Sequence, residues 1–122
     1  MMRGIRGATT VEKNEATEIE RETERLLRKM VADNEIQPEH IAQVLVTVTD
    51  DIDACFPAKA LRNLKGFDFV PVMCAQEIPV KGSLPRCIRV MMTAQTDRDQ
   101  QDVCHTFLNQ AITLRPDLLQ KG

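Results

Sequence analysis

Two arginines stand at positions where a charge is costly. Arg89 lies within the run Cys87–Met92, whose two alternating faces are otherwise apolar, as is typical of a central strand. Because a buried guanidinium without a counter-ion is very unfavourable, Arg89 must meet an anion. That anion is either a structural carboxylate, for which Glu77 is available, or the carboxylate of a ligand. Arg6, in the run Ile5–Ala8, poses the same question.

A second basic pair lies further along the chain. Lys59 and Arg62 are three residues apart in the segment Pro57–Leu64, which we predict to be a short helix, so both side chains share one helix face. Taken alone, this pair is more simply interpreted as a solvated basic face.

Groups for covalent or metal chemistry are not evident. We find no Ser/His/Asp set, no glycine-rich phosphate loop and no paired-carboxylate motif. The four cysteines form no C-x-x-C pair, and each is interpreted as a small buried hydrophobe. His40 and His105 are isolated, which favours structural or surface roles. We therefore expect neither a metal nor a cofactor.

The composition limits the classes of protein that remain. A chain of 122 residues is expected to form one domain, with a core but no large internal cavity. The formal net charge of -2, with no Trp or Tyr, argues against a nucleic-acid-binding protein. No apolar run is long enough to span a membrane, and the N-terminus lacks the apolar segment of a signal peptide. We expect a cytoplasmic protein that does not bind a membrane.

The segments that must position these residues predict an α+β fold. Apolar residues spaced three and four apart predict one long helix over Glu15–Asn34, with Asn14 as its N-cap. Alternating and β-branched runs predict five strands, over residues 2–8, 43–49, 67–74, 86–95 and 103–108. Because Pro71 interrupts the third strand, we expect a bulge or a sheet edge there. Short helices or turns are predicted at Pro38–His40 and Pro57–Leu64.

Five blocks of the chain carry a family resemblance: residues 3–11, 56–62, 71–77, 87–93 and 114–118. In this order and at these spacings they resemble the monofunctional bacterial chorismate mutases of the trimeric α/β-barrel-like class. That class is distinct from the all-helical chorismate mutases. The match runs from residue 3 to about residue 118 without large gaps.

The resemblance implies a five-stranded mixed sheet packed with one long helix and smaller helices. Residues 1–122 would form a single domain, with residues 115–122 as a mobile C-terminal tail. Three copies would assemble into a pseudo α/β-barrel, a homotrimer with active sites in clefts between subunits. The reaction would be the Claisen rearrangement of chorismate to prephenate, in the biosynthesis of Phe and Tyr, without a cofactor.

The resemblance also implies the residues of the site. From one subunit, the side chains facing the pocket would be Arg6, Glu77, Arg89, Phe107 and Leu114. From across the interface would come Phe56, Ala58, Lys59, Arg62, Met73 and Cys74, and Arg115 would come from the tail. Arg89 would donate to the ether oxygen and Arg6 would bind the side-chain carboxylate, while Glu77 and Cys74 would orient the ring hydroxyl. Lys59, Arg62 and Arg115 would attract the ring carboxylate, and Phe56 and Leu114 would form apolar walls.

Two positions depart from the family pattern, and two other functions stay open. Phe107 stands where Tyr is frequent, which removes one hydroxyl donor worth about 0.5–1.5 kcal/mol, and Met73 stands where Thr is common. One alternative is a non-catalytic binding protein for a small dicarboxylate, which would use the same cations. The other is a trimeric imine-deaminase-like protein of similar fold, although the five blocks do not resemble that family.

Overall fold

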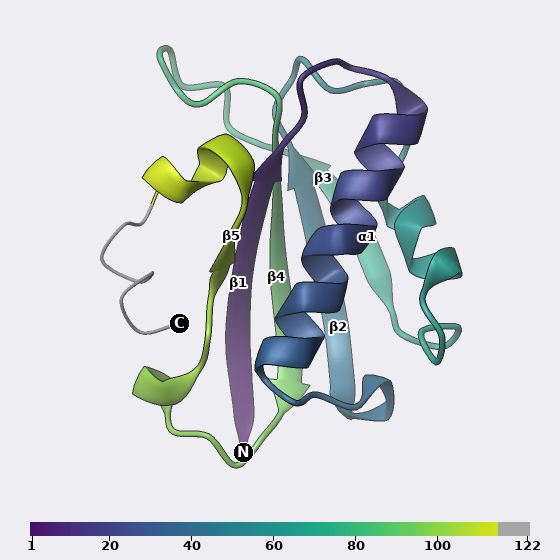
Figure 1. Cartoon of the computed structure of the whole chain (residues 1–122), viewed down its shortest axis with the longest axis vertical. Coiled ribbons are helices and arrows are strands. Elements are labelled where there is room, and N and C mark those ends of the chain that lie inside the picture. The colour runs from purple at the N-terminus through teal and green to yellow at the C-terminus, as the bar shows by residue number, and fades with distance from the viewer. Residues whose placement is uncertain (115–122) are drawn as a thin grey trace.

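A mixed five-stranded sheet with one long helix on one face organises the chain (Figure 1). The computed structural model describes residues 1–114. The strands lie in the order β3-β2-β4-β1-β5. Their bounds are β1 Met2–Thr10, β2 Ile41–Val48, β3 Val72–Gln76, β4 Cys87–Gln95 and β5 Thr106–Phe107, and helix α1 spans Ala16–Asp33. Four short 3-10 helices complete the described part: η1 Pro38–His40, η2 Pro57–Asn63, η3 Gln100–Asp102 and η4 Asn109–Thr113. The predicted α+β class is confirmed.

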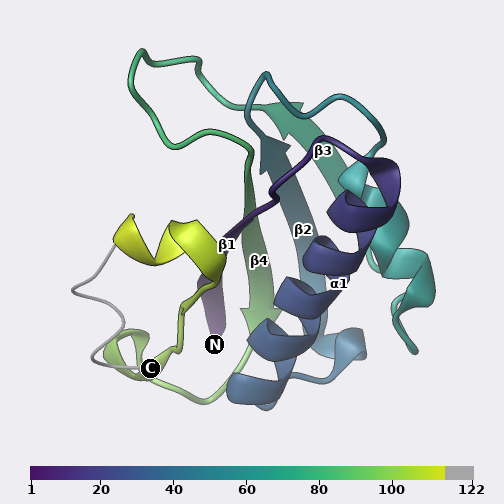
Figure 2. The ribbon, with the colours of Figure 1, turned by 45° about the horizontal axis from the view of Figure 1, so that its top comes forward.

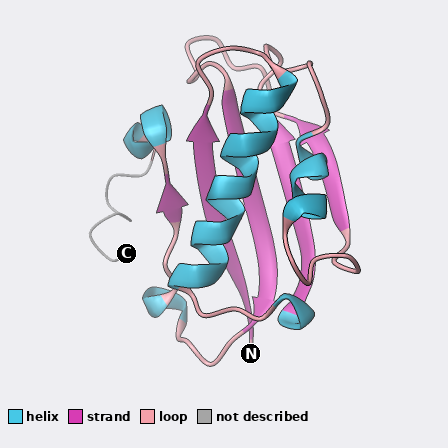
Figure 3. Ribbon diagram, turned by 45° about the vertical axis from the view of Figure 1, so that its right-hand side comes forward, coloured by secondary structure: helices cyan, strands magenta, loops and turns pink. Residues whose placement is uncertain are grey.

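The sheet combines two pairing directions. Strand β4 runs antiparallel to both of its neighbours, β1 and β2. The outer strands are parallel to theirs: β3 to β2, and β5 to β1. Helix α1 and the short helix η2 lie on the same side of the sheet (Figures 2 and 3). The opposite face, which we call the open face, carries neither of these two helices.

Alternation along β4 separates the two faces. Ile88, Val90 and Met92 are buried beneath α1 in the main core, while Met91 is 42% exposed on the open face. The prediction that β4 is a central strand is confirmed. Arg89, within the apolar run, is half-buried in this chain, with its side chain 42% exposed. Within residues 1–114, only the face of β4 that carries Ile88, Val90 and Met92 is buried in the main core.

Helix α1 follows the predicted apolar spacing, but its first turn differs from the prediction. Ile19, Leu26 and Met30 are fully buried, on the helix face that packs on the sheet. The N-cap position is held by Glu15, whose side chain makes no capping hydrogen bond, and not by Asn14. The Asn14 side chain accepts hydrogen bonds from the N–H groups of residues 53 and 54, and so fixes a loop beside the helix.

The third and fifth strands are shorter than predicted. Strand β3 begins after Pro71, because residues 64–70 form successive turns in which Val70 N–H donates to Phe67. The edge position that Pro71 predicted is confirmed, since β3 borders the sheet. Strand β5 is two residues long. Immediately before it, the Nδ1 atom of His105 accepts a hydrogen bond from the Arg6 N–H at 3.0 Å.

A polar cluster ties α1 to the chain after β5. The side-chain amide of Asn109 donates to Glu22 at 2.7 Å and to the carbonyl of Thr10 at 3.1 Å, and Arg25 donates to Glu22 at 2.9 Å. Asn109 has a φ of 54°, a left-handed conformation that Asn tolerates better than most residues. Burial alone raises the pKa of Glu22. The hydrogen bonds from Arg25 and Asn109, with the charge of Arg25, outweigh burial and lower this pKa below its ordinary value.

No helix within residues 1–114 is long and apolar enough to cross a membrane.

The lowered pKa makes the contribution of Glu22 to stability depend on pH. Stabilisation by the ionised carboxylate is present above the pKa of an unfolded Glu, about 4.3, and is lost as pH falls through the folded pKa. We expect Glu22→Gln to lower the free energy of unfolding at pH 7 by about 1 kcal/mol, because a charge-assisted hydrogen bond becomes a neutral one. The difference from the parent chain should shrink in acid, as measured by urea unfolding. Glu39→Gln, at an exposed carboxylate, is the matched control, and a difference that stays constant with pH would contradict the assignment.

Glycine at position 7 allows α1 to lie close to β1. A Cβ atom there would overlap Met30 Sδ and would lie 3.1 Å from Leu26 Cδ1, both in fully buried side chains. We expect Gly7→Ala to lower the free energy of unfolding by about 1–3 kcal/mol through overpacking. Gly4→Ala, on the same strand but the open face, places its Cβ 3.4 Å from the half-exposed Met91 and should cost much less. Equal losses in urea midpoint for the two variants would contradict this account.

Candidate active site

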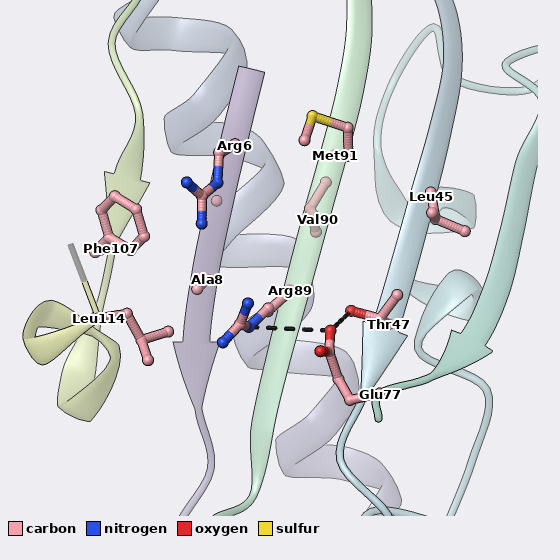
Figure 4. A pocket seen from close by; sticks show the side chains of 11 residues that line it. Arg6, Ala8, Leu45, Thr47, Glu77, Arg89, Val90, Met91, Phe107 and Leu114 are labelled. Carbon is pink, nitrogen blue, oxygen red and sulfur yellow. Dashed lines mark hydrogen bonds and ion pairs between the residues drawn. The ribbon is translucent and has the colours of Figure 1, made fainter. Parts of the chain in front are cut away.

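A pocket of about 370 Å³ lies on the open face of the sheet (Figure 4). It spans strands β1, β4 and β2, with β5 and η4 at one end and the residue after β3 at the other. Helix α1 passes behind the strands in this view, and the labelled side chains lie on the other side of the sheet. Five residues named from the sequence line this pocket: Arg6, Glu77, Arg89, Phe107 and Leu114.

The charged centre of the pocket joins three elements. Arg89 Nε on β4 lies 3.9 Å from Glu77 Oε2, so the structural partner expected for Arg89 is present. Glu77 follows directly after β3 and is fixed by its N–H, which donates to the carbonyl of Val48 at 2.8 Å. The hydroxyl of Thr47 on β2 donates to the same carboxylate oxygen, Oε2. The register pairs Thr47 with Arg89, so these groups stand side by side across two strands.

Arg6 brings a second positive charge to the same face. Register places Arg6 opposite Met91, and Arg89 opposite Ala8, so the two arginines are diagonal neighbours on adjacent strands. Among the described lining residues, two guanidinium groups face one carboxylate, an excess of one positive charge. A pocket with this balance favours an anion, and the planar guanidinium groups suit carboxylates in particular.

An apolar wall closes one end of the pocket. Phe107 pairs with Ala8 across the β5–β1 ladder, and the two share a small buried cluster with Ala111 of η4. Leu114, directly after η4, packs partly buried against the same cluster. The position of this wall therefore depends on β5 and η4, which the Asn109–Glu22 hydrogen bond connects to α1.

The residues expected from across the subunit interface lie mostly at a second pocket. Phe56, Ala58, Lys59 and Arg62 line a separate pocket of about 450 Å³ beside η2. Because i and i+3 coincide on a 3-10 helix, Lys59 and Arg62 share a face, as predicted. Buried residues of η2 anchor it on the same side of the sheet as α1. One chain thus holds the two groups on opposite faces of its sheet.

The remaining predicted residues join neither pocket. Met73 pairs with Leu45 on β2, shares the open face with it and is 72% exposed. Cys74 pairs with Val46 and packs partly buried against the core beneath α1. Arg115 lies outside the described residues.

Several lining residues were missed from the sequence. Leu45 and Thr47 line the pocket from β2, and Met91 lines it from β4. Strand alternation within residues 43–49 was the signal that could have found them, because it places Leu45 and Thr47 on one face. Leu45 and Thr47 are uncharged, so their residue types alone do not indicate a binding role.

None of the four cysteines is among the residues that line this pocket. Burial raises the pKa of the Cys87 thiol, and the nearby charge of Arg89 opposes this effect without cancelling it. Cys87 is buried as expected, whereas Cys55, Cys74 and Cys104 are half-buried, so the prediction of four buried cysteines is wrong for three of them. Within residues 1–114, no three His, Cys, Asp or Glu side chains are grouped so that they could hold a metal ion.

Fold and site together define a class of protein: an α+β domain whose open sheet face holds two arginines and one carboxylate in a pocket. Comparison with known proteins narrows this class. The family model of chorismate mutase type I matches residues 2–118. The chain is 51% identical over 118 residues to the chorismate mutase AroH of Bacillus subtilis (strain 168), covering 97% of this chain and 93% of that protein.

Two further relatives agree. The chorismate mutase AroH of Thermus thermophilus is 49% identical over 119 residues, covering 97% of each chain. The structure of a chorismate mutase from Clostridium thermocellum superposes with a TM-score of 0.88 at 48% identity, covering 90% of this chain and 97% of that one. The chain therefore belongs to the chorismate mutase type I family, and the resemblance stated from its sequence is confirmed.

Proposed function

We propose that this chain catalyses the rearrangement of chorismate to prephenate and that the open-face pocket holds the substrate. One observation carries the placement: Arg6, Glu77 and Arg89, named from the sequence, converge in one pocket with an excess of positive charge. Chorismate is a dianion with two carboxylates, an ether oxygen and a ring hydroxyl, and these groups complement guanidinium donors and a carboxylate acceptor. We place the reaction in the cytoplasm as part of the same proposal.

The reaction suits a site without a nucleophile. Chorismate rearranges by an intramolecular pericyclic step, in which one C–O bond breaks, one C–C bond forms and no proton moves. The protein has to hold a compact, chair-like conformer of the substrate. It also has to stabilise negative charge that develops on the ether oxygen as the C–O bond breaks. Fixed cations on strands meet both requirements, and the rate should be flat across neutral pH.

Each element supplies one role in this proposal. Arg89, on the central strand β4, donates to the ether oxygen and to the side-chain carboxylate, and Arg6 on β1 binds the same carboxylate. Glu77 accepts a hydrogen bond from the ring hydroxyl. Phe107 and Leu114 form the apolar wall. Phe107 lacks a hydroxyl, so it adds no donor here and orients the substrate by contact alone.

We further propose that three copies of the chain complete each site between neighbours. The group on η2 lies on the opposite side of the sheet from the pocket, so it cannot reach the pocket of its own chain. The open face also carries exposed apolar side chains at Leu45, Met73 and Met91, which a second copy would cover. In such an assembly Lys59 and Arg62 of one copy meet the ring carboxylate in the pocket of the next. Cys74 would act from that same side.

A non-catalytic dicarboxylate-binding protein remains the alternative for this arrangement of cations. The assay that separates the two follows the disappearance of chorismate and the formation of prephenate with purified protein. Saturable binding of chorismate without turnover would support the binding protein and would overturn the proposed activity.

Arg89 should contribute most to the rate. We expect Arg89→Ala to lower kcat/KM for chorismate by roughly 10²–10³-fold, because it removes a preorganised donor from the developing charge. Lys29→Ala, at an ion pair with Asp33 on the exposed face of α1, should leave kcat/KM unchanged. Steady-state kinetics of the three proteins checks this expectation. Similar activity of the parent chain and Arg89→Ala would remove Arg89 from its role.

The shared site makes a specific mixing experiment possible. Arg89→Ala damages the open-face half of a site, and Arg62→Ala damages the η2 half. When the two chains are mixed and reassembled at equal amounts, every mixed trimer regains one intact site, so roughly a quarter of the parent activity should return if mixing is random. Arg89→Ala mixed with Arg6→Ala is the control, because both lesions lie in the same half and no site is restored. Mixed oligomers that form without recovered activity would disprove a site shared between copies.

A further inference from the structure

Thr47 is the residue through which β2 touches the charged centre of the pocket. Its hydroxyl donates to Oε2 of Glu77, and its register partner on β4 is Arg89. Thr47 lies on a strand that pairs on both sides, with β3 and with β4, so its position is fixed by two ladders. Glu77 lies one residue beyond the end of β3, where its side chain lacks that support.

The arrangement shows a competition for one carboxylate. Arg89 Nε lies 3.9 Å from Glu77 Oε2, beyond the length of a hydrogen bond, whereas the Thr47 hydroxyl is hydrogen-bonded to the same oxygen. A hydroxyl bound to a carboxylate forms a charge-assisted hydrogen bond with a defined direction. A half-exposed ion pair is weaker and less directional. Thr47 therefore holds Glu77 at a distance from Arg89.

The separation of Glu77 from Arg89 affects what each of them can bind. A carboxylate that turned onto Arg89 would form a close, bidentate pair and would occupy the guanidinium N–H groups. Held by Thr47, Glu77 keeps its second oxygen, Oε1, for a ligand. Arg89, which is not closed onto Glu77, can likewise donate to an anion in the pocket.

We propose that Thr47 is a positioning residue that prevents Glu77 from closing onto Arg89, and so keeps both groups available to the substrate. This inference rests on the proposed function, since it assigns no contact between Thr47 and the substrate. It concerns a residue without charge, outside the family blocks from which the site was expected. The hydroxyl of Thr47 is the only part of the side chain that the inference requires.

The matched pair Thr47→Val and Thr47→Ser isolates that hydroxyl. Val keeps the branched shape and the strand preference of Thr but removes the donor, whereas Ser keeps the donor. We expect Thr47→Val to lower kcat/KM for chorismate roughly tenfold, the equivalent of one hydrogen bond, mainly through kcat because Arg89 is taken from the ether oxygen. Thr47→Ser should stay within about twofold of the parent chain. Thermal unfolding of both variants should match the parent, which excludes a general loss of structure.

A double-mutant cycle tests whether Thr47 acts through Glu77. In a Glu77→Ala background, Thr47→Val should cause no further loss, because no carboxylate remains to be held. An equal loss in both backgrounds would show that Thr47 acts on something else and would overturn the proposal. Equal activity of Thr47→Val and the parent chain would overturn it as well.

A crystal structure of Thr47→Val provides a readout that does not depend on turnover. We expect its Glu77 carboxylate to lie within hydrogen-bond distance of Arg89, closer than the present 3.9 Å. Glu77 unmoved in that structure would overturn the inference about Thr47. If the parent chain has no activity on chorismate, the proposed function is overturned. The position of Glu77 in the Thr47→Val structure, compared with the parent, would then still test the inference about Thr47.

Discussion

One-sided coverage of the sheet is the constraint on which the rest of the structure depends. Helix α1 packs so closely on β1 that position 7 has no space for a side chain, and with η2 it covers the core side of the sheet. Strand β4 therefore has a buried face, which carries Ile88 and Val90, and a solvent-exposed face, which carries Arg89. A charge can lie on the central strand because the described part of the same chain leaves the Arg89 side chain 42% exposed on that face. The site is a direct result of leaving that face open.

Local sequence pattern predicted those elements that depend on residues near one another in the chain. The apolar spacing of residues 16–33 and the alternation along β4 fixed the helix and its sheet contact, and Pro71 correctly marked an edge. Local pattern failed where a distant partner decided the outcome. Asn14 binds a loop about 40 residues away in place of the helix end, and β5 is short because few of its residues meet β1.

For the site, too, some features could be predicted from local sequence and others depend on distant contacts. The charged residues were accessible from the sequence, because charge within an apolar run requires an explanation, and the family blocks brought them together. Their separation onto two faces of one chain required the register of β3 and the packing of η2, which no local pattern contains. The role proposed for Thr47 is invisible to local pattern for a related reason. A threonine in a strand is ordinary, and its importance follows from where Glu77 lies after a separate strand.

The placement of the two groups on opposite faces has a consequence for how activity scales with the amount of protein. In the proposed assembly, a dilute chain has pockets but no complete site, so dilution below the dissociation constant of the assembly removes activity more steeply than it removes protein. The number of working sites then rises faster than linearly with expression until the assembly saturates. A cell with a low copy number of this chain would have less capacity than its protein content suggests, and catalysis and assembly would be governed by the same contacts.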